Sequence, residues 1–141
     1  TVFRRFGNRT GLMLALLDHT ETELQSAFLT GPPPMGPDAP PLDRLIAYGR
    51  ARLAMTSAHL DILLEAESSD DVMSHPVWMV SARHVQLLLR QLGLGPRVDV
   101  AAVAVQAPLL ATSVAHMQNV IGLDITTIGD QWEDLVRRLV D

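Results

Sequence analysis

The chain has no cysteine and no lysine, and it is poor in aromatic residues. Without cysteine it has no disulfide, no thiolate nucleophile and no thiolate-ligated zinc. Its eleven basic residues are all arginine, a compositional bias to which we attach no functional meaning. Because only 4% of the residues are aromatic, a core must be built mainly from Leu, Val, Ala, Ile and Met.

Several larger patterns are missing as well. No segment alternates apolar and polar residues between hairpin turns, which argues against a sheet. There is no internal repeat, and the start lacks the apolar segment and cleavage site of a signal peptide. With 141 residues, 48% hydrophobic and 19% charged, the chain is expected to form one all-α globular domain.

The charge is divided unevenly along the chain. Residues 1–9 carry +3, from Arg4, Arg5 and Arg9, whereas the other 132 residues carry eight arginines against sixteen acidic residues, or −8, giving the net −5. An acidic body is repelled by nucleic acid. Any contact with DNA is therefore expected from the N-terminal end.

Residues 100–123 contain no charged side chain, a length that could span a bilayer. The stretch nevertheless holds polar residues, among them Gln106, His116 and Asn119, and its first half is rich in alanine rather than leucine. That composition favours a buried or interface helix over a transmembrane one.

Apolar spacing and helix-capping residues predict six helices. Their expected ranges are Arg9–Thr30 (capped by Asn8), Pro40 or Pro41 to Met55, Ala58–Glu67, Pro76–Leu92, Val100–Ile121 (capped by Asp99), and Asp124 or Thr126 to the end. Residues 31–41 hold six of the nine prolines and form a surface loop. In the first helix, the side opposite the apolar stripe is expected to face solvent and carries Asp18, Glu21, Thr22 and Gln25. Pro108 predicts a kink in the fifth helix. The fourth has two apolar faces, which predicts a central position.

The first residues, Thr1-Val2-Phe3-Arg4-Arg5-Phe6-Gly7-Asn8-Arg9, resemble the segment that ends the recognition helix of tetracycline-repressor (TetR) family regulators and opens the next helix. The resemblance implies a TetR-like all-α fold in which residues 1–8 are the remnant of a helix-turn-helix head, most of it preceding Thr1. Residues 9–141 would then be the ligand-binding and dimerisation domain of a cytoplasmic, homodimeric transcriptional regulator, most simply a repressor.

The resemblance also assigns DNA contacts. Thr1 takes the place of a family threonine that commonly touches DNA, and Arg4, Arg5 and Arg9 stand where they can pair with phosphates of the operator. Phe3 replaces the usual tyrosine and lacks the hydroxyl that would bind a phosphate.

In such a regulator the middle helices bind the effector and the last two form the dimer. Candidate ligand-binding residues are Tyr48, Arg52, Met55, Trp78, Ser81, His84, Leu88, Thr112 and His116. Candidate interface residues are Val103, Ala107, Leu110, Ala111, Val114, Trp132, Leu135, Val136 and Leu139. For the polar candidates a second reading stays open, in which Ser81 and His84 are satisfied core residues and Thr112 and His116 lie in the dimer interface.

Other classes of protein have weaker support. His59-x-Asp61, Asp70-Asp71 and His75 could suggest a metal site, but acidic residues between helices are usually solvated caps. No Glu-x-x-His pair and no Gly-x-Ser-x-Gly turn occurs, so we expect neither an enzyme nor a bound cofactor or metal. A helical dimerisation or small-molecule-binding module without DNA-binding activity is the stronger alternative.

Overall fold

The computed structural model describes residues 9–68 and 76–141, and every regular element among them is a helix. The all-α prediction is thus confirmed for this part of the chain. The elements are α2 (Arg9–Thr30), α3 (Pro41–Ala58), α4 (Leu60–Glu67), α5 (Pro76–Gln91), α6 (Val98–Gln106), α7 (Ala111–His116) and α8 (Ile125–Val140), with short turns η2 (Gly95–Arg97), η3 (Ala107–Leu109) and η4 (Met117–Ile121).

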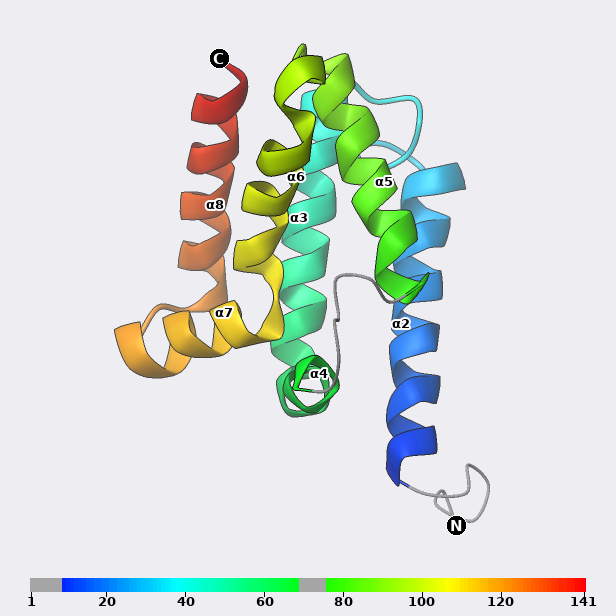
Figure 1. Ribbon diagram of the computed structural model, residues 1–141, viewed down its shortest axis with the longest axis vertical. Coiled ribbons are helices and arrows are strands. Elements are labelled where there is room, and N and C mark those ends of the chain that lie inside the picture. Colours follow the sequence, from blue (N-terminus) through cyan, green and yellow to red (C-terminus); the bar gives the residue numbers. More distant parts are fainter. Residues whose placement is uncertain (1–8, 69–75) are drawn as a thin grey trace.

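Helix α3 lies at the centre of the structure and packs against α2, α5, α7 and α8 (Figure 1). Seven of its residues are buried, from Leu45 to Thr56, on more than one side of the helix. Helices α2 and α5 flank one side of it in Figure 1, and α6 and α8 lie toward the other. The helix predicted to be central, α5, contacts α2, α3 and α6, but its Val80 and Leu87 are 39% and 48% exposed.

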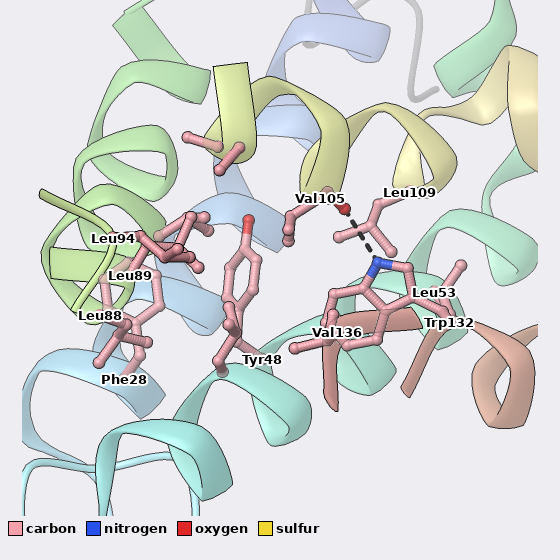
Figure 2. Packing of buried hydrophobic residues seen from close by; sticks show 14 of the residues in the cluster. Phe28, Tyr48, Leu53, Leu88, Leu89, Leu94, Val105, Leu109, Trp132 and Val136 are labelled. Atoms are coloured by element: carbon pink, nitrogen blue, oxygen red, sulfur yellow. Dashed lines mark hydrogen bonds between the residues drawn. The ribbon is translucent and has the colours of Figure 1, made fainter. Parts of the chain in front are cut away.

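One hydrophobic core joins these helices. Tyr48 stands in the middle of it, with Phe28, Leu88 and Leu89 on one side and Val105 and Trp132 on the other (Figure 2). The indole Nε1–H of Trp132 donates to the carbonyl of Val105 at 2.9 Å, so α8 is bonded to α6 through the core. A buried indole that has a partner pays no desolvation penalty for its N–H.

The uncharged segment is broken rather than kinked. Helix α6 ends at Gln106, the η3 turn contains Pro108, Leu110 is extended (φ −67°, ψ 150°), and α7 then begins with a 49° change of direction. Proline removes a backbone donor and crowds the preceding turn, which explains the site of the break. Asp99 is not the predicted cap: Arg97 holds that position and Asp99 lies in the first turn of α6.

Glu67, the last residue of α4, holds the start of α7. Its carboxylate accepts from the backbone N–H of Ala111 at 2.6 Å and of Thr112 at 2.9 Å, and from the Thr112 hydroxyl at 2.8 Å. These N–H groups have no partner within the helix, so a carboxylate there satisfies them and interacts favourably with the helix dipole. Leu17, Leu63 and Ala111 form a second, smaller cluster that joins α2, α4 and α7.

In the described residues no single helix meets the length and hydropathy expected of a membrane span. The segments Gly95–Leu109 and Ala111–Ile121 meet it only when taken together across their bend.

Candidate functional site

A cluster of polar side chains is buried where α2, α3 and α5 meet. Glu21 comes from α2, Tyr48 and Arg52 from α3, and Ser81 from α5, and the exposed fraction of each is 2% or less. We refer to these four residues as the polar centre. Charged side chains are almost never fully buried unless they are paired, so the partners of Arg52 and Glu21 determine what the cluster can do.

Arg52 is the hub of the polar centre. Its Nη1 and Nη2 both donate to the carboxylate of Glu21, the second at 3.0 Å, which makes a bidentate ion pair. Nη2 also donates to the hydroxyls of Ser81 at 2.8 Å and Tyr48 at 3.3 Å. The Ser81 hydroxyl donates to Glu21 at 3.4 Å. One guanidinium group therefore makes hydrogen bonds to side chains from three helices.

Helical spacing explains why these residues meet. Leu17, Glu21, Leu24 and Phe28 follow at four, three and four residues, so they share the buried face of α2. Tyr48 and Arg52 are likewise one turn apart on α3. The sequence had suggested that Glu21 belongs to the solvent face of its helix, and this was wrong. An acidic residue inside a regular apolar stripe is the signal that could have found it.

Burial shapes the protonation of the centre. It lowers the pKa of Arg52 to about 9, which leaves the guanidinium charged at neutral pH. Burial also raises the pKa of Tyr48 well above its usual range, so its hydroxyl stays neutral. The paired charges of Arg52 and Glu21 cancel, and the centre is neutral as a whole.

Three buried polar atoms have no hydrogen-bond partner among the described residues: Arg52 Nε, Trp78 Nε1 and His84 Nε2. The guanidinium carbon of Arg52 lies 4.6 Å from the ring centroid of Trp78, a cation–π distance. Both side chains line one small cavity of about 20 Å³ together with Tyr48, Ala82, Gln106, Leu109 and Leu110. Buried polar atoms nearly always have partners, and a cavity of this size has room for about one water-sized group.

His84 has a different environment. Its ring stacks on Phe28, with centroids 3.9 Å apart, and meets the edge of Tyr48 at 5.6 Å. Burial, with a smaller contribution from the charge of Arg44, lowers the pKa of His84 to about 4. The imidazole is thus neutral at pH 7 and packs as part of the aromatic core.

The structure brings together only some of the predicted ligand-binding residues. Tyr48, Arg52 and Ser81 belong to the polar centre, and Trp78 and His84 adjoin it. Leu88 is a core residue, and Met55 is half-buried against the same core. Thr112 bonds Glu67 at the start of α7, and His116 is exposed. Neither lines the cavity, whereas Gln106, Leu109 and Leu110 line it and were not predicted as ligand contacts.

The predicted dimer residues divide into three sets. Val103, Leu135 and Leu139 are 54%, 49% and 37% exposed, whereas Ala107 and Leu110 are half-buried. Four others are core residues of this chain and are unavailable to a partner: Ala111, Val114, Trp132 and Val136. The residues of α8 that were predicted as one interface lie on two faces of the helix. Ile128, Trp132 and Val136 repeat every four residues and face the core, whereas Leu135 and Leu139 face outward.

The remaining predicted sites cannot be placed fully. Thr1, Phe3, Arg4 and Arg5 lie outside the described residues, as do Asp70, Asp71 and His75, and of Arg9 only the backbone is described. Within the described ranges there is no group of three or more His, Asp or Glu side chains that could hold a metal ion.

Comparison of the chain with protein-family models, with curated proteins and with solved structures finds no match.

Proposed function

We propose that the chain is the effector-binding and dimerisation body of a TetR-like transcriptional regulator whose polar centre is the effector site. The observation that carries this proposal is the buried ion pair between Arg52 on α3 and Glu21 on α2, beside a cavity with two unpaired N–H donors. The TetR-like segment Thr1 to Arg9 leads directly into α2, which begins at Arg9. A change in the position of α2 would therefore be transmitted to the segment that contacts DNA.

The coupling has a physical basis. Disrupting one side of a buried ion pair costs about 3–5 kcal/mol, because an uncompensated charge remains in the interior. A guest that rearranges the contacts of Arg52 would change the free-energy difference between two positions of Glu21 by a comparable amount. Moving a two-state equilibrium from 1:99 to 99:1 needs about 5.5 kcal/mol of differential binding, so one such contact is close to sufficient. DNA would be released when α2 adopts the effector-bound position.

The proposed dimer uses the outer face of α6 and α8. Val100, Val103, Leu135 and Leu139 are 80%, 54%, 49% and 37% exposed on these two helices, which lie side by side in Figure 1. A surface hollow of about 560 Å³ lies between them, lined in part by Val100, Ala104 and Leu139. A second copy of the chain would cover this apolar face through a two-fold interface, as most homodimers do.

The test uses the protein as its gene encodes it. We expect the purified protein to bind duplex DNA from the region next to its own gene more tightly than unrelated duplexes, with an affinity that falls as salt is raised. Fluorescence anisotropy with labelled duplexes measures both the affinity for each duplex and its dependence on salt. Equal affinity for all duplexes, or no binding at low salt, would refute the regulator.

The alternative is a dimeric small-molecule-binding module that does not bind DNA. It is favoured by one observation. The polar centre and the apolar α6–α8 face both lie within residues 10–141, a part of the chain with a net negative charge. Under this alternative the protein binds effector and dimerises, but the anisotropy of every duplex stays unchanged.

A further inference from the structure

The outer face of α5 combines apolar side chains with positive charge. Met79, Val80 and Leu87 are 41%, 39% and 48% exposed, although side chains of these types are most often buried. Arg83 and Arg90 are exposed on the same helix. Steps of three and four residues along a helix keep side chains on one side, so Val80, Arg83, Leu87 and Arg90 share a face. We refer to these five residues as the α5 face.

The charge of the α5 face differs from that of the chain as a whole. Helix α5 contains no acidic residue, whereas the chain has sixteen acidic residues against eleven arginines. Arg50, Arg137 and Arg138 each bind a carboxylate, but within the described residues neither Arg83 nor Arg90 has an ion-pair partner. The α5 face is therefore a positive and partly apolar surface on an acidic protein.

These two properties together select the kind of partner. A second copy packed on this face through a two-fold axis would bring the same patch against itself, so arginines would meet arginines at a cost in free energy. A nucleic acid would bind the arginines through its phosphates but would leave the three apolar side chains without apolar contacts. A helix with an apolar face and acidic residues along its edges satisfies both kinds of side chain.

We propose that the α5 face is the docking site for an acidic amphipathic helix of another protein. The apolar side of that helix would pack on Val80 and Leu87, which are two turns or about 10 Å apart along α5. Its carboxylates would pair with Arg83 and Arg90. The α5 face shares no residue with the polar centre or with the apolar α6–α8 face, so the proposal is independent of the proposed function.

Three synthetic peptides of about 18 residues, longer than the marginal length of isolated helices, test the proposal. The first has leucines at helical spacing and glutamates on the remaining sides. The second carries lysine in place of each glutamate, and the third is a scrambled form of the first without an apolar face. Each is added to the ¹⁵N-labelled protein, and the backbone amide signals are followed.

The glutamate peptide should bind in a saturable way, with its largest shifts at the amides of the α5 face. The lysine peptide should bind at least about tenfold less tightly, because attraction to two arginines is replaced by repulsion. The scrambled peptide should be weakened similarly, because it cannot bury Val80 and Leu87 together. Added salt should weaken the glutamate complex, since the charges lie at its solvated edge.

Variants separate the α5 face from the rest of the surface. Leu87→Glu should abolish binding of the glutamate peptide, whereas Leu14→Glu on α2 should leave it unchanged, because both leucines are 48% exposed and only Leu87 belongs to the α5 face. Arg83→Glu with Arg90→Glu should reverse the preference, so that the lysine peptide binds more tightly than the glutamate peptide. Thermal unfolding checks that each variant is folded, which their exposed positions favour.

Several outcomes would overturn the proposal. They are no saturable binding of the glutamate peptide, equal binding of all three peptides, shifts centred on the α6–α8 face, and binding that survives Leu87→Glu. Duplex DNA that shifts the α5 face when no peptide does would assign the face to nucleic acid instead. The regulator is tested separately, since a protein that binds no DNA would still discriminate among the peptides.

Discussion

At the scale of single residues, the structure depends on a few side chains whose surroundings differ from what their type suggests. Arg52 and Glu21 are charged yet buried, His84 is neutral in an aromatic stack, and Gly49 is buried against the ring of Trp132. Each of these residues occupies a position where the helix spacing calls for an apolar side chain. Substitutions at His84 and Gly49 test electrostatics and packing outside the polar centre.

His84 should make stability depend on pH. Its pKa is about 4 in the folded chain against 6.5 when exposed, so the unfolded state binds more protons between these values. Stability is then complete above about pH 6.5 and falls as the pH is lowered toward 4, by roughly 2 kcal/mol at about pH 4.5. Urea unfolding at several pH values should show this loss. His84→Phe, which keeps a stacked ring, should reduce the slope, and an identical slope in the variant would exclude His84 as its source.

Gly49→Ala should destabilise the fold, although alanine is the better helix former. A Cβ at this position would overlap the six-membered ring of Trp132. Overpacking should outweigh the gain in helix propensity of about 1 kcal/mol, for a net loss of roughly 1–3 kcal/mol. Thermal unfolding of the variant measures the difference. Gly95→Ala is the control, because nothing lies near its Cβ position, and a stabilised Gly49→Ala would show that the contact with Trp132 is wrong.

At the scale of helices, the contact between Glu67 and the start of α7 is a specific joint between α4 and α7. One carboxylate caps two backbone N–H groups from another helix. Glu67→Ala should cost about 1–2 kcal/mol and speed hydrogen exchange of the Ala111 and Thr112 amides. Asp61→Ala changes an exposed carboxylate on the same helix and should do neither. Unchanged exchange at Ala111 would contradict the capping role of Glu67.

Helix positions followed largely from the sequence, because proline, glycine and apolar spacing act locally. Helix α2 ends at Thr30 as predicted, Asp124 caps α8, and Gly93 and Gly122 follow helices with φ of 93° and 90°. The break at Leu110 did not follow. Proline at position 108 predicts disruption but not its extent, which depends on tertiary partners such as Glu67, distant in the sequence.

The candidate site was harder to predict than the fold. Tyr48, Arg52 and Ser81 could be nominated as polar residues on apolar helices, but Glu21 was assigned to solvent and Thr112 to the pocket. Which polar residues meet is decided by how helices are rotated against one another, a tertiary property that single-helix periodicity does not contain.

At the scale of the whole molecule, the apolar α6–α8 face should hold two copies together. Light scattering should give about twice the chain mass of 15.4 kDa. Val103→Glu with Leu135→Glu should yield folded monomers, because charges would be buried without partners in the interface. Leu87→Glu on the exposed side of α5 should leave the dimer intact. A wild-type monomer at micromolar concentration would refute the dimer.

The central claim is that the Glu21–Arg52 pair couples the polar centre to α2 and through it to DNA binding. The most direct measurement is the DNA affinity of the protein as its gene encodes it, carrying either Glu21→Gln or Glu133→Gln, by fluorescence anisotropy. Loss of the buried pair should weaken specific binding by about tenfold or more, in line with the free energy that is lost when a buried ion pair is broken. Glu133→Gln should bind as the wild type does. A folded Glu21→Gln variant that binds the same DNA with wild-type affinity would contradict the account.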